Sequence, residues 1–194
     1  MILISILVKT TSKGDVFFTQ ERLGKGERVF RLYKFRTMVE NAEFVRDGLA
    51  VKSGDSRITP LGRILRKTSL DELPQFINVL VGDISIVGPR PALPVQLQYY
   101  NDQQRRRFEV RPGITGLATV KGRCSIPWSR RIELDIDYID NLTLMLDLII
   151  LFKTVYVVLS GKDTYYDSSN GPAFDLADPD DLPQSVPDSR KGDE

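Results

Sequence analysis

The sequence of 194 residues contains no histidine and a single cysteine, Cys124. Without histidine there is no Ser-His-Asp or Cys-His catalytic arrangement, and one cysteine cannot complete a zinc site of Cys and His ligands. Cys124 can form no internal disulfide, and we expect it to be a partly exposed structural thiol. Carboxylates are therefore the groups left for acid–base or nucleophilic chemistry. Oxygen-ligated metals such as magnesium stay open, because Asp and Glu are plentiful.

The sequence also lacks a clear membrane-spanning segment. Residues 1–8 are almost entirely apolar, but they are too short to cross a bilayer and show no signal-peptide cleavage pattern. They fit a buried strand, a first helical turn or half of a membrane element. Residues 142–159 are long enough to span, but Asp147 and Lys153 would be costly near the middle. This favours a helix that lies against the core or in the membrane interface.

The net charge of +1 hides a strong asymmetry. Residues 163–194 hold nine acidic and two basic residues, a net charge of −7, so residues 1–162, with 25 basic and 17 acidic residues, carry +8. The basic part predicts anionic partners, which could be nucleic acid, phosphorylated small molecules or an anionic membrane surface. The acidic part contains four prolines and few large apolar residues, which predicts a disordered tail without a catalytic role.

Local patterns predict an α+β fold that is mainly helical, with an N-terminal β-hairpin and short strands. Residues 16–20 and 29–35 are rich in β-formers and enclose a Gly-Lys-Gly turn, which indicates the hairpin. Thr59 and Pro60 are a typical N-cap and first helical residue. The charged run at 105–107 ends an amphipathic helix, and we expect it to face solvent or a membrane.

The segment 69–75 contains adjacent carboxylates, Asp71 and Glu72, that admit two interpretations. In the first, Ser69 and Glu72 form a capping box that opens a helix, and Asp71 favours the helix dipole. In the second, the same helix N-terminus binds phosphate and keeps Asp71 ionised, with Arg63, Arg66 and Lys67 on the preceding helix holding the anion. Magnesium could bridge carboxylate and phosphate, and Asp71 could attack phosphorus directly.

Three further segments place arginines on rigid turns. Prolines flank Arg90 in residues 87–91 and fix the backbone around a guanidinium suited to phosphate. Arg111 precedes a Pro-Gly turn in residues 111–116, and Arg123 follows after a predicted short strand. Each alone is typical of a turn with a surface charge, but three within a short stretch favour an anion site.

Six segments together, residues 16–24, 33–38, 69–75, 82–91, 111–116 and 133–138, resemble the bacterial sugar transferases, the monotopic polyprenyl-phosphate phosphoglycosyl transferases. The resemblance covers roughly residues 1–160. It implies a magnesium-dependent transfer in two steps at the cytoplasmic face of the bacterial inner membrane, with amphipathic helices at the membrane interface. A UDP-sugar would give up its sugar 1-phosphate to a carboxylate with release of UMP. Polyprenyl (undecaprenyl) phosphate would then accept it, the first membrane step of exopolysaccharide, O-antigen or glycan synthesis.

The resemblance also implies roles for residues. Asp71 would be the nucleophile, and Glu72 would be its partner as base or metal ligand, so that both carboxylates are candidate Mg²⁺ ligands. Phosphate-binding and supporting acidic positions follow from the same motifs: Lys34, Arg66, Arg90, Arg111 and Arg123 for phosphate, and Asp135 and Asp147 as supporting acids. The sugar, the polyprenol length and the pathway stay open, as does a homodimer.

Family members begin with a re-entrant hydrophobic helix, and residues 1–8 would be the remnant of its second arm. We therefore expect three parts: this remnant, a catalytic domain at 9–162 and the acidic tail at 163–194. An alternative is a shortened, catalytically silent membrane-associated scaffold of the same fold. A nucleic-acid binder rests on the basic charge alone, without a recognised binding motif, so we expect no nucleic-acid partner.

Overall fold

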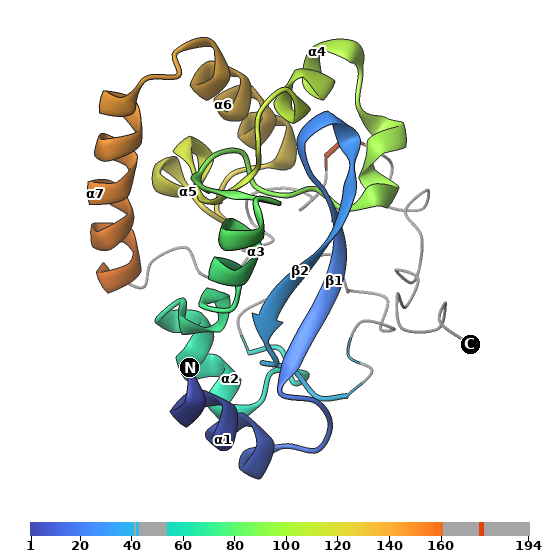
Figure 1. Cartoon of the computed structure of the whole chain (residues 1–194), viewed down its shortest axis with the longest axis vertical. Helices are drawn as coiled ribbons and strands as arrows, with labels where there is room; N and C mark the ends of the chain where they lie inside the picture. The colour runs from blue at the N-terminus through green and yellow to red at the C-terminus, as the bar shows by residue number, and fades with distance from the viewer. Residues whose placement is uncertain (41, 43–53, 161–174, 177–194) are drawn as a thin grey trace.

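The computed structural model describes residues 1–40, 42, 54–160 and 175–176. Of the predicted acidic tail, only residues 175 and 176 are among them. The described part confirms a mixed α+β fold (Figure 1). Its elements, with η for 3₁₀ helices, are α1 (Ile2–Thr11), β1 (Phe17–Leu23), η1 (Lys25–Glu27), β2 (Val29–Phe35), α2 (Pro60–Lys67), η3 (Leu70–Glu72), α3 (Gln75–Val81), β3 (Ser85–Val87), η4 (Pro94–Tyr99), α4 (Asp102–Arg105), η5 (Arg106–Phe108), β4 (Gly113–Thr115), α5 (Leu117–Lys121), α6 (Trp128–Asp140) and α7 (Leu144–Ser160).

The predicted hairpin is confirmed. Strands β1 and β2 pair antiparallel from Phe17 opposite Phe35 to Leu23 opposite Val29. Gly26 lies in the turn with φ of 64°, a conformation that glycine adopts without strain. The hairpin runs through the centre of the molecule (Figure 1), so side chains of β2 can reach the residues that follow α2.

A second, parallel pair of short strands, β3 and β4, brings two of the arginine turns together. Ser85 lies opposite Gly113 and Val87 opposite Thr115. The backbones of these turns approach so closely that a Cβ on Gly113 would lie 2.2 Å from the amide nitrogen of Gly88. The Gly113 amide also donates to the Pro89 carbonyl at 2.8 Å. The turns that carry Arg90 and Arg111 are therefore one packed unit. The strand expected just before Lys121 is wrong, because residues Leu117–Lys121 form the helix α5.

Helix α2 begins as the sequence predicts. The Thr59 hydroxyl accepts from the Gly62 amide at 2.9 Å, and Pro60 is the first helical residue. Gly62 packs directly on the chain that leaves β2, since a Cβ there would lie 2.0 Å from the Thr37 carbonyl oxygen. One turn further on, Arg66 Nε donates to Thr37 Oγ1 at 2.8 Å. The close approach at Gly62 thus positions the Arg66 guanidinium.

The expected capping box at Ser69 and Glu72 is wrong. Ser69 has a left-handed backbone, with φ of 57°, and makes no side-chain cap bond. Its hydroxyl instead accepts from Arg123 at 2.7 Å, and Glu72 accepts from Lys34 at 2.7 Å. Hydrogen bonds to charged donors are stronger than a neutral cap, which explains the outcome. The segment forms only the short helix η3, and α3 begins later, at Gln75.

Helix α3 buries its polar side and exposes its apolar side. Gln75 and Asn78 are 3% and 0% exposed, whereas Leu80 is 87% exposed. Asn78 accepts from the Tyr33 amide at 3.1 Å and donates to the Arg31 carbonyl at 2.8 Å. These bonds tie α3 to β2 and leave its apolar residues pointing outward.

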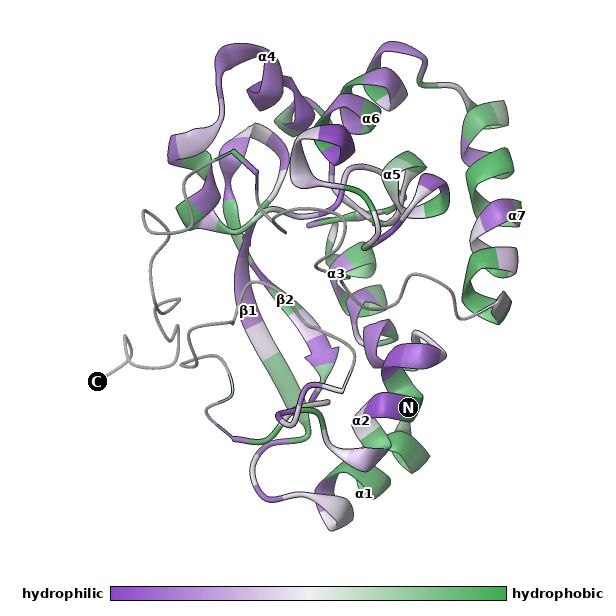
Figure 2. Cartoon of the chain, turned by 180° about the vertical axis from the view of Figure 1, so that it is seen from behind, coloured by the Kyte–Doolittle hydropathy of each residue, from purple (hydrophilic) through white to green (hydrophobic). Residues whose placement is uncertain are grey.

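Three helices carry an exposed apolar surface: in Figures 1 and 2, α7 lies along one long side of the molecule, α1 at its lower end and α3 nearer its centre. We call this the apolar face. Its exposed residues are Ile2, Leu3, Ile6 and Leu7 of α1, Phe76, Ile77, Leu80 and Val81 of α3, and Leu144, Met145, Leu148, Ile149, Phe152, Val155, Tyr156 and Leu159 of α7. Among the described helices, none combines the length and hydropathy needed to cross a bilayer.

Helices α1 and α7 are each anchored on the body by one buried side. Residues 2–11 are helical, which rules out the strand alternative, and Val8 packs with Phe35 and Leu65. Ile150 of α7 is fully buried among residues of β3, α5 and α6. Residues 142–159 thus lie against the core, as expected, while most of α7 stays exposed.

The arginines of the charged run at 105–107 lie in different environments. Arg106 is paired at the surface with Asp140, as a solvated run would be. Arg107 is only 2% exposed and its Nη2 donates to Asp135 Oδ2 at 2.6 Å. The expectation that the whole run faces solvent or membrane is therefore wrong for Arg107. The aromatic rings of Tyr100 and Trp128 lie within 5.5 Å of its guanidinium and replace water around the charge.

Breaking this buried pair should strongly destabilise the fold. Asp135→Leu leaves the Arg107 charge buried without its counterion, and we expect the free energy of unfolding to fall by about 3–5 kcal/mol. The double variant Asp135→Leu/Arg107→Met removes both charges and should recover most of that loss. Urea denaturation at pH 8 measures both. A double variant no more stable than the single one would contradict this account of the pair.

Candidate functional site

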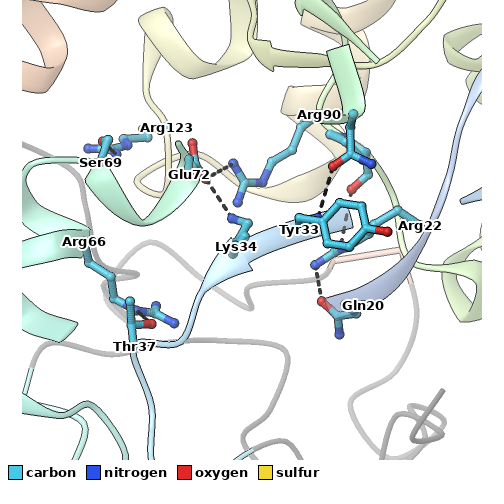
Figure 3. Close-up of polar contacts among 12 residues, drawn as sticks. Gln20, Arg22, Tyr33, Lys34, Thr37, Arg66, Ser69, Glu72, Arg90 and Arg123 are labelled. Carbon is cyan, nitrogen blue, oxygen red and sulfur yellow. Dashed lines mark hydrogen bonds and ion pairs between the residues drawn. The ribbon is translucent and has the colours of Figure 1, made fainter. Parts of the chain in front are cut away.

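The two adjacent carboxylates lie on η3, in the bend between α2 and α3, and face different surroundings. Asp71 is 8% exposed. The Glu72 side chain is 18% exposed and points toward cationic groups of the hairpin and of the turn after β3 (Figure 3). Two acids that are neighbours in sequence thus have different electrostatic environments.

Glu72 is held as an ionised carboxylate. Its Oε1 accepts from Lys34 Nζ at 2.7 Å and lies 3.9 Å from Arg90 Nη1 (Figure 3). Burial alone would raise the pKa of Glu72, but Lys34 and Arg90 outweigh burial and lower the pKa to about 2. Burial also lowers the pKa of Lys34, with Glu72 acting in the opposite direction. Glu72 is therefore ionised at neutral pH and hydrogen-bonded to Lys34.

Asp71 behaves differently. Burial raises its pKa to about 6, against the positive charges of Lys34 and Arg66 and with the help of the Glu72 charge. The helix N-terminus expected to keep Asp71 ionised does not set its titration, because η3 is a single short turn. A carboxylate with this pKa is ionised above about pH 6 and poorly solvated. That combination favours reaction with an electrophile over resting as a solvated ion.

Two more arginines are held in fixed positions around η3 (Figure 3). Arg66 bonds to Thr37, and Arg123 bonds to the Ser69 hydroxyl at 2.7 Å. Arg63 and Lys67, also considered on α2, are exposed. The structure thus brings four predicted phosphate-binding cations together around the carboxylates: Lys34, Arg66, Arg90 and Arg123.

Other predicted residues lie elsewhere. Arg111 is exposed and its guanidinium approaches Gly82, at the end of α3. Asp135 pairs with Arg107 in the interior, and Asp147 accepts from the Tyr138 hydroxyl at 2.7 Å. The side-chain partners of these two acids thus lie on η5 and α6, and are neither Asp71 nor Glu72.

The sequence did not indicate that Arg22 helps to position the turn that carries Arg90. Its Nη1 donates to the Pro91 carbonyl at 3.2 Å and its Nη2 to Gln20 Oε1 at 2.6 Å. Burial, with the neighbouring charge of Arg90, lowers the pKa of Arg22 to about 9. Arg107 donates to the Arg90 carbonyl at 3.0 Å. A half-buried and a buried arginine therefore hold the turn that presents Arg90, which strand alternation alone could not reveal.

A groove opens beside the carboxylates, between α3 and α7. Its polar residues are Ser69, Glu72, Arg90, Thr115, Thr119, Arg123 and Thr154, and its apolar residues are Leu73, Phe76, Ile114, Val157 and Val158. The lining of this groove thus combines charged residues of the site with apolar residues of α3 and α7.

The donor set suits a magnesium ion shared with a substrate better than a closed metal site. Within the described residues, no group of three or more acidic, His or Cys side chains is placed to hold a metal. Mg²⁺ in phosphate-processing sites is usually bound by one or two carboxylates together with substrate phosphates. Asp71 and Glu72 fit that pattern. A buried carboxylate, an ionised one and four cations form a cluster whose positive charges can hold phosphate groups.

Comparison with known proteins agrees with this chemistry. The family model described as bacterial sugar transferase matches residues 1–161. The chain belongs to the bacterial sugar transferase family, and it is an enzyme.

Three relatives illustrate the similarity. The chain is 48% identical over 160 residues to the uncharacterized sugar transferase EpsL of Bacillus subtilis, covering 82% of this chain and 78% of the relative. It is 42% identical over 167 residues to the UDP-N-acetylgalactosamine-undecaprenyl-phosphate N-acetylgalactosaminephosphotransferase of Aeromonas hydrophila, covering 83% and 39%. It is 40% identical over 170 residues to the undecaprenyl-phosphate galactose phosphotransferase of Salmonella typhimurium, covering 80% and 36%. The chain thus spans well under half of the last two.

Proposed function

We propose that this protein transfers a sugar 1-phosphate from a UDP-sugar to polyprenyl phosphate, through a phospho-sugar bound to Asp71. The observation that carries the proposal is Asp71 itself, buried, with a pKa of about 6, and surrounded by cations that can hold a diphosphate. The names of the relatives from Aeromonas hydrophila and Salmonella typhimurium support undecaprenyl phosphate as the acceptor.

In the first step a carboxylate oxygen of Asp71 attacks the phosphorus that carries the sugar. The new bond is Asp71 O–P, and the bond that breaks joins this phosphorus to the oxygen bridging to the nucleotide. UMP leaves with the electron pair. Burial removes the water that would otherwise solvate the Asp71 carboxylate and lower its nucleophilicity.

In the second step a phosphate oxygen of the polyprenyl phosphate attacks the same phosphorus. The P–O bond to Asp71 breaks, the carboxylate is regenerated and polyprenyl-diphospho-sugar leaves. The bond between the sugar and its own oxygen stays intact throughout, so the configuration at the anomeric carbon is retained.

The cations carry most of the stabilisation. Negative charge spreads over the equatorial oxygens in a phosphoryl-transfer transition state, and fixed positive groups stabilise it. The turn that carries Arg90 is held by Arg22 and Arg107, while Lys34, Arg66 and Arg123 are held by Glu72, Thr37 and Ser69. Such fixed groups need little reorganisation when the reaction occurs.

Asp71 and Glu72 are the residues that would hold Mg²⁺ together with the donor diphosphate. When bound there, the ion would neutralise charge on the phosphate oxygens. The carboxylate of Glu72 suits this role because its pKa of about 2 keeps it ionised at all working pH values.

The apolar face supports a location at the inner-membrane surface, with the site on the cytoplasmic side, where UDP-sugars are found. Exposed apolar residues on α1, α3 and α7 can enter the lipid interface without spanning it. Products of this kind begin the assembly of exopolysaccharides, O-antigens or other membrane-linked glycans.

The test is an assay of UMP release by the purified protein with Mg²⁺, detergent-solubilised undecaprenyl phosphate and a panel of UDP-hexoses and UDP-N-acetylhexosamines. We expect at least one donor to give UMP and a polyprenyl-diphospho-sugar in equal amounts. If none of the donors gives UMP, although circular dichroism shows that the protein is folded, the result would favour the silent scaffold and contradict the proposal.

A further inference from the structure

We propose that the isoprenoid chain of the acceptor enters through the groove between α3 and α7, with its first units against Phe76, Val157 and Val158. The inference rests on the proposed function and goes further by assigning the lipid subsite to particular residues of this chain. We call these three residues, with Leu73 and Ile114, the apolar wall of the groove.

The groove has the chemistry of a prenyl phosphate. At its charged side lie Arg90 and Arg123, beside Glu72, and these guanidinium groups suit a phosphate. The five residues of the apolar wall themselves carry no hydrogen-bonding side chain. An amphipathic ligand with a charged head and a hydrocarbon chain satisfies both sides, whereas a nucleoside or sugar would leave its polar groups unpaired against the wall.

The groove is also continuous with the apolar face. Phe76 belongs to both, since it lines the groove and is 48% exposed. Val157 and Val158 are partly buried on α7, while Val155 and Tyr156 of the same helix are exposed. Figure 2 shows apolar residues along most of α7. A chain dissolved in the membrane interface can therefore reach the carboxylates without crossing a polar surface.

A polar contact fixes the width of the groove. Thr154 Oγ1 of α7 donates to the Ile150 carbonyl at 2.8 Å, so it accepts from Thr115 Oγ1 of β4 at 2.7 Å. Both threonines line the groove. This bond holds α7 against the strand that follows Arg111, so that Val157 and Val158 are set one turn further along the helix.

The experiment compares Val157→Asn with Val155→Asn, the same change on the same helix inside and outside the groove. A polyprenyl phosphate of three isoprene units in detergent serves as acceptor, which removes the need for the enzyme to insert into a bilayer. Two quantities are measured: the UMP burst with UDP-sugar in the absence of acceptor, and the KM for the short acceptor.

We expect Val157→Asn to raise the KM for the acceptor about tenfold relative to Val155→Asn, because a buried apolar contact is lost. The burst should occur in both variants, since no lipid takes part in it. Equal KM values in the two variants would overturn the lipid subsite while leaving the proposed function intact. A wild-type protein without any burst would instead contradict the proposed function.

A second pair keeps the inference testable if Val157→Asn gives no burst because it is misfolded. Phe76→Ala on α3 lies in the groove, and Leu80→Ala is an exposed neighbour on the same helix. The same KM difference is expected between these two. No difference in either pair would overturn the assignment.

Discussion

Replacing Asp71 by asparagine should abolish turnover, with a loss on the order of 10⁴-fold or more in kcat. The amide cannot form the bond to phosphorus, and the remaining cations can only bind substrate. UMP release with and without polyprenyl phosphate measures the loss. Wild-type activity in this variant would contradict the assignment of Asp71 as nucleophile.

The same variant should remain folded, which separates loss of chemistry from loss of structure. The pKa of Asp71 is raised in the folded protein, from 3.8 to about 6. The folded state therefore binds the proton of Asp71 more tightly than the unfolded state, which stabilises the fold below about pH 4. This stabilisation is lost as the pH rises through about 6. At pH 8 the buried charge costs about 3 kcal/mol. Asp71→Asn should thus be at least as stable as the wild type at pH 8.

Replacing Glu72 by glutamine should lower kcat on the order of 10²-fold at pH 8 and raise the Mg²⁺ concentration needed for half-maximal rate. The change keeps the shape of the side chain but removes a charge. Steady-state assays over a Mg²⁺ series measure both effects. Glu109→Gln, at an exposed site paired with Arg106, is the matched control and should change neither.

The pH profile gives Glu72 a second signature. In the wild type the rate of the UMP burst should fall as the pH drops through about 6, because protonated Asp71 is not nucleophilic. The Glu72 charge raises the pKa of Asp71, so in Glu72→Gln this acid limb should move to lower pH. A slower variant with an unchanged acid limb and unchanged Mg²⁺ dependence would show that Glu72 serves only as a structural partner of Lys34.

Local patterns predicted the elements around the site well, where short-range rules decide them. β-branched and aromatic residues around a glycine turn form the hairpin, and Thr59 with Pro60 begins α2. The motif at Asp71 and Glu72 indicated two carboxylates that the structure places among cations. These features depend on neighbours in sequence, so the sequence carries enough information to find them.

The errors arise where distant charges override local rules. Ser69 and Glu72 match a capping box, but Arg123 and Lys34, both far away in sequence, take their side-chain oxygens. Arg107 belongs to a charged run by sequence and to a buried ion pair by structure. Only the folded arrangement supplies the partners that decide these cases.

The covalent phospho-sugar on Asp71 is the central claim, and trapping it tests the account most directly. Protein is mixed with Mg²⁺ and a UDP-sugar without acceptor, quenched in acid and analysed by mass spectrometry. We predict up to one equivalent of UMP and a peptide containing Asp71 that gains the mass of the sugar phosphate. UMP that appears only when polyprenyl phosphate is added, with no modified peptide, would show direct transfer and contradict the account.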